Sequence, residues 1–149
     1  MSSFDLSKPL VIGGDHAGFE MKEKVAAYLK EKGYSVIDKG AFDSSSVDYP
    51  DFAHPVAEAV EKEEAAAGLL FCGSANGVCM TANKHQGIRA AICWQTDIAR
   101  LARQHNNANV ICIPARYLAY ENARDIIDIF LTTAFEGGRH GNRVDKISC

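Results

Sequence analysis

Short apolar runs alternate with amphipathic stretches along most of the chain. The apolar runs are a few residues long and are bounded by glycine or polar residues, which is typical of buried parallel strands. They predict five strands, at about residues 10–14, 34–38, 69–72, 88–93 and 109–114. In the stretches between the runs, apolar residues recur every three to four positions, which indicates helices.

In the first of these stretches, apolar residues recur at i, i+4, i+7 and i+8, which is one face of a helix. Met21, Val25, Tyr28 and Leu29 form this set, and Gly33 is expected to end the helix. Similar patterns predict helices at about residues 19–32, from 50, from 76, at 97–105 and at 119–134. Thr96 is expected to be the N-cap of the fourth helix.

Strands that alternate with helices of this length predict an α/β protein. The expected architecture is a three-layer α/β/α sandwich with a five-stranded parallel sheet, Rossmann-like in type. Ligands of such folds bind beyond the carboxyl ends of the strands. Two segments fall outside the pattern: a polar loop at 39–50, long enough to be functional or mobile, and a glycine-rich tail at 135–149 without apolar periodicity.

Length and charge narrow the possible functions. The 149 residues suit one domain spanning 1–149. A net charge of −3 gives no general basic field, which argues against a nucleic acid partner. No apolar run approaches the length of a membrane span, and the N-terminus lacks a signal-peptide pattern, so we expect a cytoplasmic protein with no membrane partner.

No cofactor or metal motif is present. The five cysteines are odd in number and lack CxxC spacing, which argues against a disulfide framework and a structural zinc site. The histidines show no HxxxH or HExxH spacing. GGDHAG at 13–18 fails the dinucleotide pattern because Asp15 stands where the second glycine is needed, and no phosphate-loop motif occurs. We therefore expect neither a cofactor nor a metal.

The stretch GLLFCGSANGVCMTANK at 68–84 carries the strongest chemical signal. It places Cys72 at the carboxyl end of a strand, before a glycine-containing turn and a helix start. Free amides and the helix dipole at such a turn favour negative charge. They predict a lowered pKa for the Cys72 thiol, which would make it a base or a nucleophile. The alternative is a small buried hydrophobic residue, and this stretch alone does not decide between them.

Other reactive residues are expected near the same edge of the sheet or on the tail. Asp15 and His16 follow the first strand, and Arg116 follows the fifth. Arg139 and Arg143 lie four apart, so in a helix both guanidiniums would point one way and suit a phosphate dianion. The alternative for them is a disordered basic tail. Together these residues suit proton transfer on a small phosphorylated substrate.

His105 lies in RQHNN, at a polar helix end. A lone histidine is more often structural than catalytic, but this polar setting favours a catalytic role.

The motifs in combination resemble the type B ribose-5-phosphate isomerases, in the family that also holds allose-6-phosphate and galactose-6-phosphate isomerases. The resemblance covers about residues 10–144. It rests on GGDHAGF, DKGAF, VDYPDFA, CGSANG with ANKHQGIRA, ARQHNNANV and EGGRHGNRV, in this order.

The resemblance implies a cofactor-free aldose–ketose isomerase that works through a cis-enediolate. Cys72 matches the proton-transferring base, and His105 matches the acid that helps to open the furanose ring. The matching substrate-binding positions are Asp15, His16, Gly73, Ser74, Ala75, Asn76, Gly77, Asn106, Arg116, Arg139 and Arg143. It also implies a homodimer with shared active sites, in which the His105 segment comes from the neighbouring subunit and the tail contributes to the site.

The turn departs from the family pattern, which is commonly CGTGIG. Ser74 keeps the hydroxyl of the usual threonine, whereas Ala75 replaces a glycine and would be strained if φ is positive there. Asn76 is polar where the family is often apolar. Some members lack the cysteine and use a carboxylate on the following helix, but the present Cys72 favours the thiol. A six-carbon phosphosugar isomerase and a non-catalytic sugar-phosphate-binding regulator remain alternatives.

Overall fold

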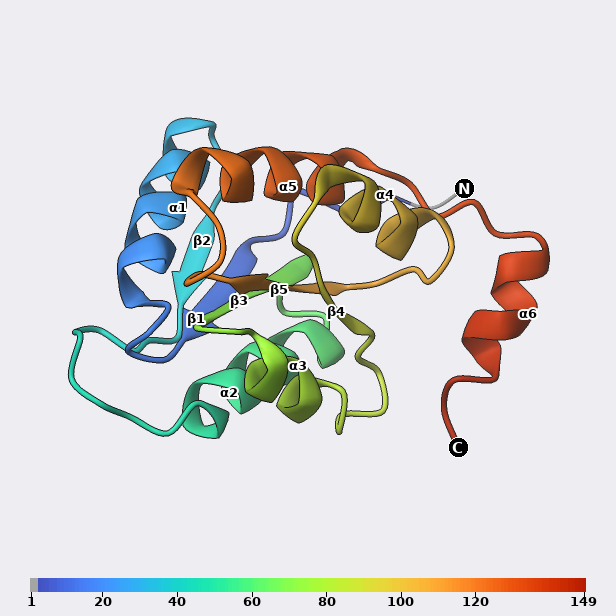
Figure 1. The fold of residues 1–149 in the computed structure, drawn as a ribbon. Coiled ribbons are helices and arrows are strands. Elements are labelled where there is room, and N and C mark those ends of the chain that lie inside the picture. The colour runs from blue at the N-terminus through green and yellow to red at the C-terminus, as the bar shows by residue number, and fades with distance from the viewer. Residues whose placement is uncertain (1–2) are drawn as a thin grey trace.

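The computed structural model describes residues 3–149 and has three layers (Figure 1). Strands and helices alternate up to the fifth helix, and a sixth helix follows on the tail. The elements are β1 (Leu10–Gly14), α1 (Phe19–Glu31), β2 (Val36–Asp38), α2 (Pro50–Glu61), β3 (Ala67–Cys72), α3 (Asn76–Ala82), β4 (Ala90–Ile92), α4 (Thr96–Gln104), β5 (Val110–Pro114), α5 (Tyr120–Thr132) and α6 (Arg139–Asp145).

The five strands form one sheet in the order β2-β1-β3-β5-β4, and all four pairings are parallel. The chain passes from β1 to β2 on one side of β1, and β3 pairs with β1 on the other side. This reversal is the kind of switch point at which open α/β sheets bind ligands. Gly14 pairs with Phe71 there, so the residues that follow β1 emerge beside the end of β3.

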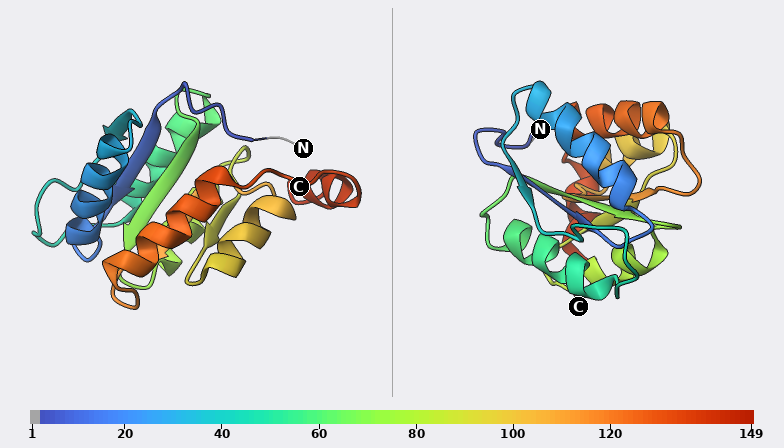
Figure 2. Two further views of the ribbon diagram at one scale, coloured as in Figure 1. Left: turned by 90° about the horizontal axis from the view of Figure 1, so that it is seen from above. Right: turned by 90° about the vertical axis from the view of Figure 1, so that its left-hand side faces the viewer.

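Alternate strand residues point to opposite faces of the sheet and build two cores. Ile12, Leu69, Phe71, Ile111 and Ile113 face the layer of α1, α4 and α5. The other face, under α2 and α3, is filled from the intervening positions, including Leu70, Cys72 and Cys112. The two helical layers are seen on either side of the sheet in Figure 2. The predicted three-layer α/β/α architecture with a five-stranded parallel sheet is therefore confirmed.

The turn after β1 rests directly on the backbone of β3. A Cβ atom built at Gly14 or at Gly18 would lie 2.1 Å or 2.2 Å from the carbonyl oxygen of Phe71. The amide of Asp15 donates a hydrogen bond to the same oxygen, at 3.3 Å. Only glycine allows this approach, which brings Asp15 to the end of β3.

Two details differ from the sequence-based expectations. Thr96 is not the N-cap of α4, because it already has helical geometry and the extended residue before it, Gln95, accepts the first helical bond from Ala99. The tail also forms a helix, α6, although it lacks apolar periodicity. His140 is the only buried residue of α6, so its pattern carries almost no hydrophobic signal. In the part of the chain that the structure describes, no helix is long and apolar enough to cross a membrane.

Candidate active site

A thiol and a carboxylate meet at the carboxyl edge of the sheet. Cys72, the last residue of β3, donates a hydrogen bond from Sγ to Oδ2 of Asp15 at 3.2 Å. Both residues are buried, with 9% and 6% of their surfaces exposed. The other carboxylate oxygen of Asp15 accepts hydrogen bonds from the amides of Ala17 and Gly18. The carboxylate is therefore fixed in position and turned towards the thiol.

This environment raises the pKa of the Cys72 thiol to about 11, from an ordinary value of 9.0. Burial is the largest cause, and the hydrogen bond to Asp15 and its negative charge add to it. The amides of Gly73 and Ala75 lower the pKa of the thiol, as the turn was expected to do, but their effect is smaller. The predicted lowering of this pKa is therefore wrong for the single chain, because burial of the sulfur, together with the facing carboxylate, outweighs the amides of the turn.

The turn from Gly73 to Gly77 connects this thiol to α3. Ala75 has φ of 68° and is fully buried, so the position adopts the left-handed backbone that a glycine would accept more easily. The Ser74 hydroxyl accepts hydrogen bonds from the amide and the side chain of Asn76, which closes the turn. The strain expected at Ala75 is thus present, and the Ser74 hydroxyl acts within the turn itself.

Arg116 and His16 flank the same edge. The amide of Arg116 donates to the carbonyl of Gly73 at 3.1 Å, and a Cβ at Gly73 would lie 3.2 Å from the guanidinium. Arg116 therefore lies against the turn as a nearby cation. His16 Nδ1 accepts a hydrogen bond from the amide of Val47, which ties the long loop at 39–49 to the turn after β1.

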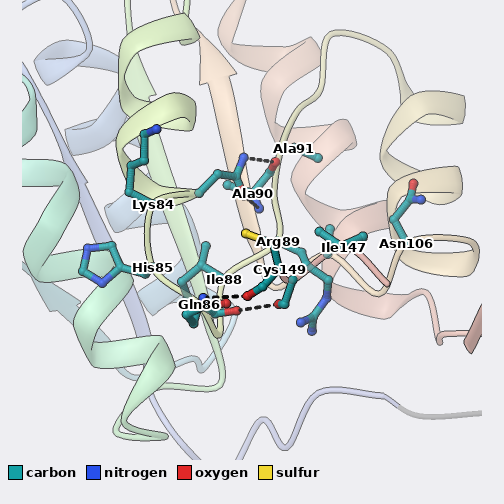
Figure 3. A pocket seen from close by; sticks show the side chains of 13 residues that line it. Lys84, His85, Gln86, Ile88, Arg89, Ala90, Ala91, Asn106, Ile147 and Cys149 are labelled. Atoms are coloured by element: carbon teal, nitrogen blue, oxygen red, sulfur yellow. Dashed lines mark hydrogen bonds between the residues drawn. The ribbon is translucent and has the colours of Figure 1, made fainter. Parts of the chain in front are cut away.

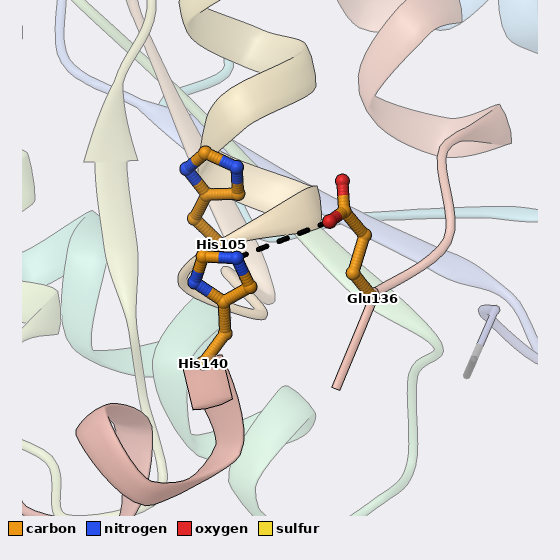
Figure 4. Close-up of side chains that lie close together, drawn as sticks. All are labelled: His105, Glu136 and His140. Atoms are coloured by element: carbon orange, nitrogen blue, oxygen red, sulfur yellow. Dashed lines mark ion pairs between the residues drawn. The ribbon is translucent and has the colours of Figure 1, made fainter. Parts of the chain in front are cut away.

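The remaining predicted residues lie at the opposite edge of the sheet. His105 is the C-cap of α4, which runs back from the carboxyl edge, and it lies five residues before β5 begins. Its ring stacks on His140 of α6, the helix that also carries Arg139 and Arg143 (Figure 4). α6 stands apart from the layers, at the end of the molecule away from the loop between β3 and α3 (Figure 1).

The separation between the two groups follows from strand length. β3 pairs with β5 so that Cys72 lies opposite Pro114, and five residues of β5 span the sheet from edge to edge. At about 3.3 Å per residue, the two edges are roughly 16 Å apart. Within one chain, the structure brings together Asp15, His16, the turn at 73–77 and Arg116. It leaves His105, Asn106, Arg139 and Arg143 as a separate second group.

A cavity of about 530 Å³ does not contain the thiol. It lies between the segment after α3, the start of β4 and the end of the tail (Figure 3). Gln86 donates to the carbonyl of Cys149 and accepts from the hydroxyl of Ser148 across it. Of the predicted site residues, Asn106 alone lines this cavity, so its size does not identify the reactive centre.

Two residues near the predicted site were not singled out from the sequence. Tyr49 lies against the start of α3, because a Cβ at Gly77 would be 2.4 Å from its ring. The VDYPDFA motif could have indicated it. His140 lies under His105, and its place between the two arginines in GGRHGNRV was the available signal.

One group of side chains has the composition of a metal site. Ligand atoms of His105, Glu136 and His140 all lie within 4.8 Å of one another. The His140 Nε2 and Glu136 Oε2 atoms are 3.9 Å apart. No other such group of three was found in residues 3–149.

Comparisons with known proteins agree on one family. The model of the family described as Ribose/Galactose Isomerase matches residues 10–147. Ribose-5-phosphate isomerase B of Escherichia coli is 43% identical over 141 residues, which cover 95% of each chain. The structure of the ribose 5-phosphate isomerase from Thermotoga maritima has 48% identity and a TM-score of 0.93, and the match covers 95% of this chain and 97% of that one.

A further solved structure includes a ligand. Ribose-5-phosphate isomerase B from Mycoplasma genitalium, with bound ribulose-5-phosphate, is 43% identical with a TM-score of 0.91 and 95% coverage of both chains.

Proposed function

The chain belongs to the Ribose/Galactose Isomerase family, and on this premise we propose that it interconverts ribose 5-phosphate and ribulose 5-phosphate. The observation that carries the proposal is the buried thiol–carboxylate pair at the switch point of the sheet. A relative that matches nearly the whole chain has been solved with ribulose-5-phosphate bound. The reaction moves one hydrogen between two neighbouring carbons and needs no net oxidation.

Cys72 is the proposed proton carrier. Its thiolate takes the proton from C2 of the open-chain aldose, and the C–H electrons form the C1–C2 double bond of a cis-enediolate. As this double bond forms, the electrons of the C1 carbonyl move onto O1. The resulting thiol then returns the proton to C1, and the hydroxyl proton of O2 passes to O1, so that C2 becomes the ketone and C1 carries the hydroxyl. Atoms and electrons balance within the substrate, so the proposal includes no cofactor and no metal.

The thiol needs activation, because a pKa of about 11 leaves little thiolate at neutral pH. Asp15 is in position to accept the thiol proton through the existing hydrogen bond. Cations brought close to the sulfur would also favour thiolate, since an opposite charge stabilises the ionised form. Arg116 already lies on the adjacent turn, and the other cations belong to the second group of residues.

The turn at 73–77 is the proposed support for the enediolate. The amides of Gly73 and Ala75 are directed at the Cys72 sulfur, so they also lie near the place where negative charge develops on the substrate. Asp15 and His16 complete this side of the proposed site.

We further propose that a complete site forms between two copies of the chain. The first group has the base, and the second has His105 for ring opening, Asn106, and the arginines for phosphate. A distance of roughly 16 Å across the sheet prevents both groups from reaching one sugar phosphate within a single chain. A symmetric dimer would bring the first group of one copy to the second group of the other and create two equal sites. In this arrangement the tail at 135–149 serves the neighbouring copy.

An assay of the purified protein with ribose 5-phosphate and with allose 6-phosphate tests the proposal. We expect turnover of ribose 5-phosphate with the higher kcat/KM. A preference for allose 6-phosphate would instead identify a six-carbon isomerase on the same scaffold. Binding of either sugar without turnover would contradict an enzymatic function and identify a regulator. The cytoplasmic location expected from the sequence stays a prediction.

A further inference from the structure

We propose that His140 is a positioning residue for the ring-opening step, because its imidazole stacks on His105 and fixes the plane in which His105 presents its proton. The inference rests on the proposed function, in which His105 is the acid that opens the furanose ring. His140 itself does not touch the substrate in this account. Its effect passes through His105.

The stack with His140 is the contact that we infer to fix the plane of the His105 ring. The ring centroids of His105 and His140 are 4.2 Å apart and the rings are inclined by 10° (Figure 4). Among the residues that the structure describes, no hydrogen bond to the His105 ring is recorded. A catalytic imidazole is usually oriented by a hydrogen bond to one of its nitrogens. Here a neighbouring ring takes that place.

The stack of His140 on His105 also holds the tail helix α6 in place. His140 is the only buried residue of the helix, with 8% of its surface exposed. The segment before α6 is tied to α4 by the amide of Glu136, which donates to the carbonyl of Gln104 at 3.1 Å. Two attachments, one to the residue before His105 and one to its ring, therefore hold α6 against the end of α4.

The geometry favours this role over a metal site. A metal ion bound by an imidazole nitrogen lies close to the plane of that ring, at about 2.0–2.1 Å for zinc. The planes of two nearly parallel stacked rings do not meet at such a short distance from the rings. A single ion therefore cannot lie in both planes at once. His105 and His140 could bind one ion together only if a ring turned and the stack was lost.

Electrostatics also suit a neutral supporting ring. The pKa of His140 is lowered, first by burial and then by the charges of His105, Arg139 and Arg143, while Glu136 acts in the opposite direction. Two charged imidazoles in contact would repel each other. A neutral His140 avoids this repulsion.

Isotope exchange separates ring opening from proton transfer at carbon. Ribulose 5-phosphate cannot form a furanose, because the oxygen that would close the ring carries the phosphate. Its C1 hydrogen can therefore exchange with solvent deuterium through Cys72 alone, whereas net conversion of ribose 5-phosphate also needs the ring to open. Both rates are measured on the same protein, together with circular dichroism and the oligomeric state.

For His140→Ala we expect net conversion of ribose 5-phosphate to fall roughly 10- to 100-fold, the size of loss that misplacement of a catalytic group causes. Exchange into ribulose 5-phosphate, measured at a saturating concentration of this sugar, should remain close to that of the parent. His140→Phe keeps a flat ring under His105 and should recover most of the lost conversion. Asn142→Ala, an exposed change on the same helix, is the matched control and should resemble the parent.

The inference is overturned if His140→Ala loses both rates equally, loses neither, or is not rescued by His140→Phe. His105→Ala distinguishes this failure from failure of the proposed function. His105→Ala should lose more of the net conversion of ribose 5-phosphate than His140→Ala does, again with little loss of exchange into ribulose 5-phosphate. If His105→Ala shows no such difference between the two rates, the ring-opening role of His105 is wrong, and the role of His140 fails with it.

Discussion

The Cys72 thiol donates its hydrogen bond to Asp15 from the end of one strand to the turn after the neighbouring strand. The two residues are 57 positions apart in sequence and are joined because β1 and β3 are adjacent in the sheet. Burial and the carboxylate together outweigh the amides of the turn and raise the pKa of the thiol. The reactivity of the thiol is therefore controlled by charges that reach this pair.

Asp15→Asn should lower the pKa of the Cys72 thiol. The substitution removes the negative charge and the charged acceptor, both of which raise this pKa, but it leaves burial, the largest cause, in place. We expect the titration midpoint to fall from about 11 while staying above the ordinary 9.0. Thiolate absorbance followed against pH, with Cys72→Ala as the blank, measures it. An unchanged midpoint would show that Asp15 does not influence the sulfur.

Cys72→Ala should fold and bind substrate but lose turnover by about 10²–10⁴-fold, the usual effect of removing a positioned base. Cys72→Ser should be nearly as poor, because an alcohol is much less acidic than a thiol. Deuterium incorporation into the product carbon should almost disappear in both variants. Cys149→Ala, which changes an exposed thiol, should remain active. Near-parent turnover in a folded Cys72→Ala protein would direct attention to Asp15 or His105 as the base.

A mixture of inactive Cys72→Ala and His105→Ala proteins should regain activity if sites form between copies. After random exchange, half of the dimers are mixed and each contains one intact site, so about a quarter of the parent activity is expected. The mixture is assayed after exchange, and mixed dimers are verified by mass. Mixed dimers without activity would refute a shared site.

Arg139→Ala and Arg143→Ala should mainly weaken substrate binding, because the two side chains lie four apart on one helix. A hydrogen bond to a charged group contributes about 1.5–3 kcal/mol, which corresponds to roughly 10- to 100-fold in affinity. Binding of ribose 5-phosphate and of ribose to each variant is measured by calorimetry. Lys146→Ala removes an exposed cation just after the same helix and is the control. Equal losses for both sugars would argue against phosphate contacts.

Ala75→Gly should leave stability nearly unchanged. Relief of the left-handed backbone gains about 1–2 kcal/mol. The greater freedom of glycine in the unfolded chain costs about 0.4–1 kcal/mol, and loss of the buried methyl group costs about 0.8 kcal/mol. The net change is within about 1 kcal/mol, or roughly 2–4 °C in Tm for a chain of this size.

Ala57→Gly is the matched control, because Ala57 is fully buried inside α2. There the helix penalty of glycine, about 1 kcal/mol, adds to the lost methyl group, about 0.8 kcal/mol. Thermal unfolding of both variants should therefore separate them clearly. Equal destabilisation would show that Ala75 carries no relievable strain.

The strands and most helix boundaries could be predicted because their signal is local. β1 begins and ends as expected, and Gly33 ends α1 with a positive φ. Apolar periodicity did not predict α6, because a helix that is held through one buried imidazole has no apolar face to detect. Thr96 was misassigned by one position because threonine is favoured at helix starts and Gln95 is not.

The chemical residues could be named from the sequence, but their electrostatics could not. The pKa of Cys72 depends on which side chain follows the neighbouring strand, and no local pattern states which strands are neighbours. The separation of His105 from Cys72 is also a property of topology, because it depends on α4 running back across the sheet. Motifs therefore named candidate residues, while the expectation that His105 comes from a neighbouring subunit came from the resemblance and not from any local pattern.

The contact of Gly14 and Gly18 with the Phe71 carbonyl has a consequence for how such a chain can diverge. The distance between Asp15 and Cys72 is set where main chain meets main chain, so it does not depend on the size of any interior side chain. Ile12 or Leu69 could be exchanged for another apolar residue over generations while Cys72 and Asp15 stay within hydrogen-bonding distance. A side chain at either glycine would push the two strands apart and separate Cys72 from Asp15. Substitutions in the interior can therefore accumulate without changing the distance between Asp15 and Cys72.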